Sequence, residues 1–346
     1  MQIQSWSITG RSFHFGLHGM GQEETSITMP SDSLFAALVA RLARTAGAQT
    51  AQEFCRPFIE GKPPFLLTST FPLAGDVRFF PPPLNTRRPP EKTEADAKSF
   101  KRVMVVSEQL YRRLLDGAMC ADLINDVHRL QSKKVWISES EFKHLAAAIR
   151  FDGTKLWDVE QRPRVTLDRL SQASTLFFTG QVTFAEGCGL WFGIHWLDAD
   201  EHLRDVVRKL LEDLSEAGLG AERNSGLGAA KITETGMLEL PDPIKMWTNL
   251  SRYLPRDDEM GVLSHENSAF TLTSVGGWLD SPAKSGQRRR TINLLIEGSV
   301  FGSLPRPVPG QVADTRPRYK ADDDPLKHPV YRSGLAMAVG LKGGAA

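Results

Sequence analysis

The segment from residue 218 to residue 228 has the densest set of residues that could hold a ligand. Four glycines surround three polar residues in it: Gly218, Gly220, Gly226, Gly228, Arg223, Asn224 and Ser225. Glycine has no Cβ and adopts positive φ without strain, so its backbone N–H groups can approach a ligand closely. The planar guanidinium of Arg223 carries donors that match phosphate oxygens. We therefore expect this segment, called the Gly-rich loop below, to bind a polyanion.

The same pattern also fits a simple turn. A glycine commonly ends an amphipathic helix, and a short glycine motif alone is weak support for phosphate binding. The segment is not a P-loop, because the glycines are not followed by Gly-Lys-Ser or Gly-Lys-Thr. It is not a dinucleotide fingerprint either, because it follows a predicted helix and precedes a predicted strand. A turn and a phosphate site therefore both stay open at this point.

His14 is the second candidate, in the sequence Phe-His-Phe-Gly that ends at Gly16. A histidine beside a glycine could stack on a base or bond a phosphate. It could equally be a satisfied polar group at the end of a strand, or a general base. Base catalysis needs partner groups at defined positions, and the sequence does not show them. We therefore expect a structural or RNA-contacting histidine.

Arginines form three further clusters that could contact phosphates: Arg87 with Arg88, Asp168 with Arg169, and the run Arg288, Arg289 and Arg290. The first cluster adjoins prolines, which suits an extended arm along a nucleic acid strand. In the second, the carboxylate either forms an ordinary ion pair or orients the guanidinium toward a phosphate. The third is either an exposed loop or a contact to RNA or to an acidic neighbouring protein.

Composition limits the class of protein. The 346 residues carry a net charge of +1 and 41% hydrophobic residues, so a packed core is expected and any nucleic acid site must be local. The three cysteines are far apart, which argues against disulfides and a zinc site and favours the cytoplasm. We expect no cofactor and no metal. No apolar run approaches the ~18 residues of a membrane span, and residues 1–6 resemble a strand, not a leader.

Hydrophobic periodicity predicts an α+β fold in two parts. The first part has a strand at 2–9, a helix capped by Ser31 or Asp32, a strand at 65–73, and a long insertion at about 81–165 with helices near 107–116 and 139–149. A hairpin of 175–184 with 190–196 follows, then a helix capped by Asp198 and ended by Gly218, and a strand at 229–238. We expect domains at 1–240 and 241–346, the second with strands at 245–254, 270–275, 291–301 and 329–341 and a surface loop at 313–325.

Together these motifs resemble the RAMP proteins of type III CRISPR effector complexes, and among them the family of the fourth subunit of the Csm (type III-A) complex. The segments that carry the resemblance are 13–16, 30–38, 79–84 with 101–103, 165–169, 220–228 and 328–334. They span nearly the whole chain in the expected order. The insertion departs from the family pattern because it is long and rich in proline near 81–90.

The resemblance implies two ferredoxin-like (RRM-like) domains with an inserted thumb, and no catalytic activity. It implies a subunit that caps one end of a filament on CRISPR RNA (crRNA), holds the crRNA 5′ handle, and contacts the large polymerase-like subunit and the first backbone RAMP subunit. The residues we expect to contact RNA are His14, Gly16, Ser31, Arg87, Arg88, Arg169, Gly218, Gly220, Arg223, Asn224, Ser225, Gly226, Gly228, Arg288 and Arg289.

Two alternatives stand beside this expectation. One is the equivalent subunit of the related Cmr (type III-B) complex. The other is an endoribonuclease of the RAMP type that processes crRNA with His14 as general base. In those nucleases the glycine-rich loop lies near the C-terminus, whereas here it ends far before Ala346.

Overall fold

The computed structural model describes residues 1–16, 23–87, 100–150, 154–168, 170, 172–279, 287–317, 326 and 328–342. Within this part of the chain the dominant element is a nine-stranded sheet in the order β14-β1-β13-β6-β7-β8-β10-β9, with β5 also paired to β13. Its strands are β1 (Gln2–Thr9), β5 (Phe65–Leu67), β6 (Phe71–Ala74), β7 (Val77–Phe80), β8 (Val105–Ser107), β9 (Val127–Leu130), β10 (Val135–Ser138), β13 (Cys188–Trp196) and β14 (Lys231–Glu239).

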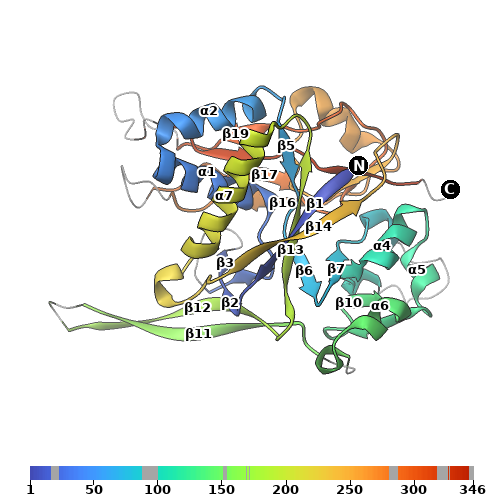
Figure 1. The fold of residues 1–346 in the computed structure, drawn as a ribbon, viewed down its shortest axis with the longest axis horizontal. Helices are drawn as coiled ribbons and strands as arrows, with labels where there is room; N and C mark the ends of the chain where they lie inside the picture. Colours follow the sequence, from blue (N-terminus) through green and yellow to red (C-terminus); the bar gives the residue numbers. More distant parts are fainter. Residues whose placement is uncertain are drawn as a thin grey trace.

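Helices α1 (Ser31–Ala46) and α7 (Glu201–Ala217) pack side by side and, with α2 (Ala48–Ile59), stand beside the sheet (Figure 1). The leucine stripes of α1 and α7 are buried, as the 3.6-residue periodicity predicts. Gly218 ends α7 with φ +81°, as expected. The predicted N-terminal caps of α1 and α7 were wrong. Pro30 precedes α1. Asp200, not Asp198, caps α7, and its carboxylate accepts from Leu203 N–H at 2.8 Å.

The insertion extends the main sheet. Strands β8, β10 and β9 continue it beyond β7, and α4 (Glu108–Leu115) and α6 (Glu139–His144) confirm the two helices expected there. The remaining short elements are η1 (Leu84–Arg87), α5 (Cys120–Leu123) and η2 (Ala147–Ile149). Tyr111 of α4 stacks on Phe80 of β7 with ring centroids 4.5 Å apart, and both side chains are fully buried. The core therefore runs continuously into the insertion.

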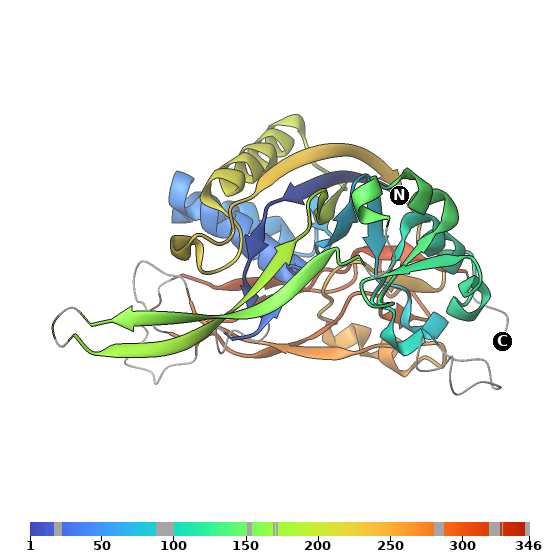
Figure 2. The same cartoon turned by 90° about the horizontal axis from the view of Figure 1, so that it is seen from below.

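A long two-stranded ribbon projects from the body (Figures 1 and 2). It consists of β11 (Trp157–Leu167) and β12 (Ser174–Phe184), and the base of β12 also pairs with β2 (Ser12–Phe13). The predicted hairpin of β12 with β13 was wrong, because β13 pairs with β1, β5 and β6 inside the main sheet. Alternation shows which side chains share a face of a strand, but it does not show which strand is the partner.

The C-terminal part is a set of short strand pairs. They are β15 (Trp247–Asn249) between β18 (Val300–Phe301) and β21 (Ala338–Gly340), then β16 (Leu272–Val275) with β17 (Ile292–Leu295), and β19 (Val312–Asp314) with β20 (Tyr331–Ser333); η4 (Asp257–Ser264) is a 3₁₀ helix. The four predicted strand regions all contain strands, each shorter than expected. Strand β19 begins at the edge of the predicted loop at 313–325, so the start of that loop was wrong. The predicted domain boundary falls between β14 and β15 and stays a prediction.

Candidate nucleic acid interface

The Gly-rich loop leaves α7 at Gly218 and returns to β14, with a 3₁₀ turn, η3 (Arg223–Ser225), at its tip. Two backbone hydrogen bonds fasten it to the N-terminal strands: Ala221 N–H donates to the His14 carbonyl at 2.9 Å, and Gly228 N–H donates to the Ser12 carbonyl at 2.8 Å. The loop and the His14 segment, which lie about two hundred residues apart in the sequence, are thus in direct contact.

Most of the loop's glycines serve packing inside the protein. A Cβ on Gly220 would lie 2.4 Å from the His14 carbonyl oxygen, and one on Gly228 would lie 2.2 Å from the Leu219 carbonyl oxygen. Both residues also have φ above +80°. Gly226 differs, because a Cβ there would meet nothing within 4 Å. The absence of Cβ atoms therefore mainly lets the loop approach its own protein backbone, and contact between a ligand and these backbone groups stays a prediction.

The exposed tip of the loop consists of the three polar residues Arg223, Asn224 and Ser225 followed by Gly226. The Arg223 guanidinium reaches back only weakly, with Nη1 at 3.5 Å from the Gly218 carbonyl oxygen. Ser225 Oγ donates to a Glu222 carboxylate oxygen at 3.0 Å. The loop therefore exposes the side chains of this tip more than a cradle of backbone N–H groups, and their contact with a polyanion stays a prediction.

His14 is buried, with 4% of its surface exposed. Its Nδ1 lies 2.7 Å from the Gly180 carbonyl oxygen at the base of β12. A carbonyl can only accept, so Nδ1 carries the proton and donates. His14 thereby ties the N-terminal strands to the ribbon, while Gly16, in the short strand β3 (Phe15–Gly16) that pairs with β4 (Thr25–Ser26), is exposed.

The ribbon has two chemically different faces. The register pairs Pro163 with Phe178 and Val165 with Leu176 on one face, and Arg162 with Thr179 and Arg164 with Phe177 on the other. Exposed apolar side chains on the first face and at the tip are Val159, Val165, Leu167, Leu170, Leu176 and Phe178. A solvated two-stranded ribbon gains little stability by itself. The uncovered apolar face therefore marks the ribbon as a contact element.

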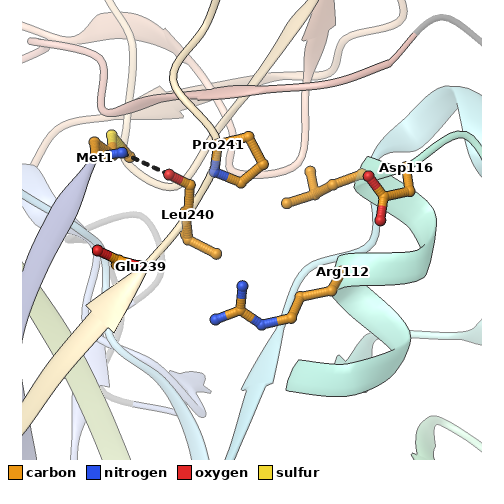
Figure 3. A pocket seen from close by; sticks show the side chains of 7 residues that line it. Met1, Arg112, Asp116, Glu239, Leu240 and Pro241 are labelled. Atoms are coloured by element: carbon orange, nitrogen blue, oxygen red, sulfur yellow. Dashed lines mark hydrogen bonds between the residues drawn. The ribbon is translucent and has the colours of Figure 1, made fainter.

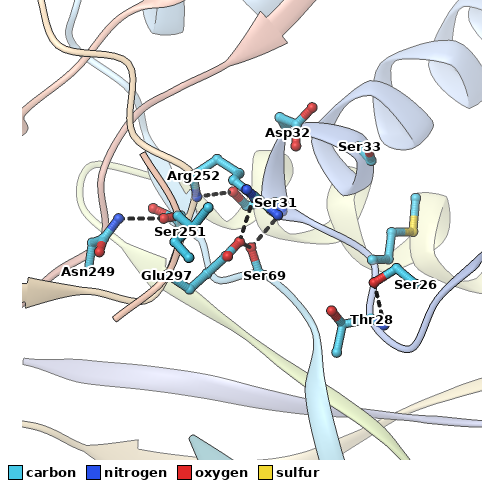
Figure 4. Close-up of polar contacts among 12 residues, drawn as sticks. Ser26, Thr28, Ser31, Asp32, Ser33, Ser69, Asn249, Ser251, Arg252 and Glu297 are labelled. Atoms are coloured by element: carbon cyan, nitrogen blue, oxygen red, sulfur yellow. Dashed lines mark hydrogen bonds and ion pairs between the residues drawn. The ribbon is translucent and has the colours of Figure 1, made fainter. Parts of the chain in front are cut away.

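Ser31 lies in the joint between the N-terminal and C-terminal parts (Figure 4). Its N–H donates to Ser69 Oγ at 2.8 Å, and its own Oγ accepts from Arg252 N–H at 2.8 Å. Ser69 Oγ also donates to Glu297, which forms an ion pair with Arg252. Ser31 is buried. In this structure it joins the two parts of the chain, and its predicted RNA contact stays a prediction.

Of the arginine clusters, Arg88 and Arg169 lie outside the described residues. Arg87 is half-buried in η1 next to Cys120, and burial lowers its pKa, so it does not stand on an exposed arm. Asp168 directly follows β11 at the far end of the ribbon, where its Oδ1 accepts from Leu170 N–H at 3.0 Å. These placements leave the RNA contacts predicted for Arg87, Arg88 and Arg169 untested.

The run at 288–290 lies next to β17 in the C-terminal part. Arg289 is half-buried and donates to the Gly276 carbonyl at 3.0 Å, whereas Arg288 is exposed and places its guanidinium carbon 4.7 Å from the centre of the Trp278 ring. Sequence reasoning missed Trp278. Its signal was a tryptophan directly after two glycines and within reach of an arginine run.

A pocket among the described residues lies on another part of the surface (Figure 3). It has a volume of about 470 Å³ and is lined by Met1, Arg112, Leu115, Asp116, Glu239, Leu240 and Pro241. None of the predicted site residues lines it. In the described part of the chain, no helix is long and apolar enough to cross a membrane, and no three His, Cys, Asp or Glu side chains gather as metal ligands would.

Residues 242–341 match the family model described as the CRISPR Csm4 C-terminal domain. The predicted resemblance to the Csm4 family is confirmed. A Csm4 protein of Mycobacterium tuberculosis is 26% identical over 307 residues, which cover 87% of this chain and 87% of that protein. Similarity to Csm4 proteins therefore extends well beyond the C-terminal domain.

Solved Csm4 structures share the fold. A crystal structure of a Csm3–Csm4 subcomplex of the type III-A interference complex matches with a TM-score of 0.66 and 18% identity, over 99% of this chain and all of that chain. A Csm1–Csm4 cassette in complex with pppApA matches with a TM-score of 0.57 and 15% identity over both full chains. The α+β architecture expected from the sequence is therefore shared with solved Csm4 structures.

Proposed function

We propose that this chain is a non-catalytic, crRNA-binding subunit of a type III-A CRISPR interference complex. It caps the filament by holding the crRNA 5′ handle. It docks onto the large polymerase-like subunit and the first backbone RAMP subunit, the partners that Csm1 and Csm3 represent in the solved Csm4 complexes. It works in the cytoplasm, where its three buried free thiols stay reduced.

One observation carries this proposal: the Gly-rich loop, the His14 segment and the ribbon converge. Ala221 N–H donates to the His14 carbonyl, and the His14 ring donates to Gly180 of the ribbon. An arginine, an asparagine and a serine are thereby held exposed near the base of a projecting ribbon with a partly basic face. Guanidinium and amide donors beside apolar and basic contact elements suit a single strand of RNA.

The strand order supports a ferredoxin-like N-terminal domain. Reduced to its central strands, the main sheet runs β14-β1-β13-β5, and the chain visits them as β1, α1, β5, β13, α7, β14. This is the split βαβ arrangement expected from the sequence. We propose the C-terminal part as a degenerate second copy, because its described residues form short strands and a 3₁₀ helix.

The nuclease alternative fits the geometry less well. A general base must reach the proton that it abstracts, and His14 is buried with Nδ1 engaged by a carbonyl. Incubation of the purified chain with repeat RNA decides this point. We expect intact RNA, whereas single-site cleavage that His14→Ala abolishes would establish the nuclease.

Protection of the crRNA 5′ end in the assembled complex tests the main proposal. We expect Arg223→Ala to expose the handle to ribonuclease, with the largest difference from the unaltered complex at low salt, where a phosphate contact contributes most to affinity. Arg208→Ala is the matched control, because Arg208 is an exposed arginine on α7 that pairs with Asp205. Handle protection equal to that of the unaltered complex in both variants would contradict the proposal. The large subunit that copurifies also separates a Csm complex from a Cmr complex.

A further inference from the structure

The strand pair β16–β17 carries an aromatic and basic face on the C-terminal part, apart from the Gly-rich loop. Trp278 lies beyond the end of β16 and forms a β-bridge with Arg288, so both side chains point to the same face. Trp278 is 52% exposed, although most tryptophans of the chain are buried. The indole is half-exposed and has a guanidinium over one ring face, so it contributes little to the hydrophobic core of the C-terminal part.

Polar groups lie further along the same strand pair. Ser274 and Asn293 are directly opposite each other, and Ser274 Oγ donates to the Asn293 side-chain Oδ1 at 2.7 Å. Arg290 is exposed and donates to the Asp314 carbonyl, which anchors it at the edge of the face. Arg288 and Arg290 therefore give this part of the surface two exposed arginines, two residues apart.

This combination matches single-stranded RNA better than other ligands. The indole stacked by Arg288 is half of a sandwich, and a nucleobase can take the other ring face, because every base has a π-face. Arg290, two residues from Arg288 along the chain, supplies charge for a neighbouring phosphate. An acidic protein segment would use the arginines but would not use an exposed tryptophan ring.

We propose that Trp278 and Arg288 form a base-stacking site for single-stranded RNA, with Arg290 as a phosphate contact. The inference rests on the proposed RNA-binding function and adds a second contact point, on the C-terminal part of the chain. An RNA held at both points would cross from the Gly-rich loop to this hairpin. The site needs no conformational change, because the Arg288 guanidinium already lies on the ring.

Fluorescence anisotropy of the full chain with a labelled single-stranded RNA of mixed sequence tests the site. We expect Trp278→Ala to weaken binding about tenfold, as loss of one base–aromatic stack does. Trp278→Phe should keep most of the affinity, and Arg288→Ala should weaken it. Met260→Ala is the matched control, since Met260 is 51% exposed on η4 of the same part of the chain. Its binding should equal that of the unaltered chain.

Two further comparisons distinguish failure of the stacking site from failure of the proposed RNA-binding function. If Arg223→Ala weakens binding and Trp278→Ala does not, the stacking site is refuted while the proposed function stands. If neither variant weakens binding, both fail. Labelled poly-glutamate is the second probe: loss of its binding in Arg288→Ala, with RNA binding unchanged in Trp278→Ala, would assign the face to an acidic protein and overturn the inference.

Discussion

A buried ion pair helps to hold the two parts of the chain together. Asp32, in the first turn of α1, lies 2.9 Å from Arg332 of β20, with the carboxylate fully buried and the guanidinium 8% exposed. Arg332 also donates to Ser33 Oγ at 2.9 Å. The pair links residues 300 positions apart. It therefore holds the C-terminal strands against the N-terminal helix, next to the Ser31 contacts.

Replacing Arg332 with leucine should destabilise the whole chain. Removal of one partner from a buried ion pair costs about 3–5 kcal/mol, because the other charge stays buried without its counter-ion. The N-terminus of α1 offsets up to about 1 kcal/mol for a carboxylate in its first turn. We therefore expect a loss of about 3 kcal/mol. With an unfolding entropy of about 2.1 cal/mol/K per residue over 346 residues, this lowers Tm by ~4 °C.

Differential scanning calorimetry of the isolated chain measures this shift. The informative control is Asp32→Asn combined with Arg332→Leu, because it removes both charges and leaves no unpaired ion. We expect the double variant to unfold at a higher temperature than Arg332→Leu alone. A single variant that unfolds at the temperature of the unaltered chain, or a double variant whose loss is the sum of the two single losses, would refute the reasoning.

Two further predictions concern α7 and the loop that follows it. Hydrogen bonding to Arg41 holds the pKa of Asp213 below its ordinary 3.8, so the pair stabilises the fold above about pH 4 and loses this effect as pH falls through the lowered pKa. Asp213→Asn should therefore cost about 1 kcal/mol at pH 7 and less at pH 3, in urea titrations at both pH values; an equal cost at both would contradict this. Gly228→Ala should lower the free energy of unfolding by more than about 3 kcal/mol, since the added Cβ would lie 2.2 Å from the Leu219 carbonyl oxygen. Gly226→Ala should lower it by only about 1 kcal/mol, since the added Cβ would lie in open space. Equal losses in the two alanine variants would refute the packing role given to Gly228.

The sequence predicts those elements whose signals are local. The leucine stripe and Gly218 locate α7, and the alternation of residues 2–9 locates β1, because helix and strand periods and a C-terminal glycine act within one element. Partner choice is not local. Strand β12 alternates as well as β13 does, yet it pairs with β11 to form the ribbon. Only the complete sheet, with β13 taken up at its centre, decides between the two pairings.

The sequence is equally limited in what it predicts about the candidate RNA site. Gly220 and Gly228 have no Cβ because another part of this backbone fills the space, and a bound ligand would require the same residue type. The sequence therefore predicts a tight loop without deciding what approaches it. Tertiary packing buries Ser31 and half-buries Arg87, which the sequence alone does not show, and their RNA contacts stay predictions. Trp278 was missed because its partner Arg288 comes ten residues later, across a hairpin.

The salt dependence of RNA binding by the Arg223→Ala variant tests the central claim most directly. Each phosphate contact to single-stranded nucleic acid contributes about −0.7 to the slope of log affinity against log salt concentration. If the exposed tip of the Gly-rich loop holds the RNA backbone, Arg223→Ala must bind more weakly and show a slope that is shallower by about 0.7. An affinity and a slope identical to those of the unaltered chain would show that the RNA lies elsewhere.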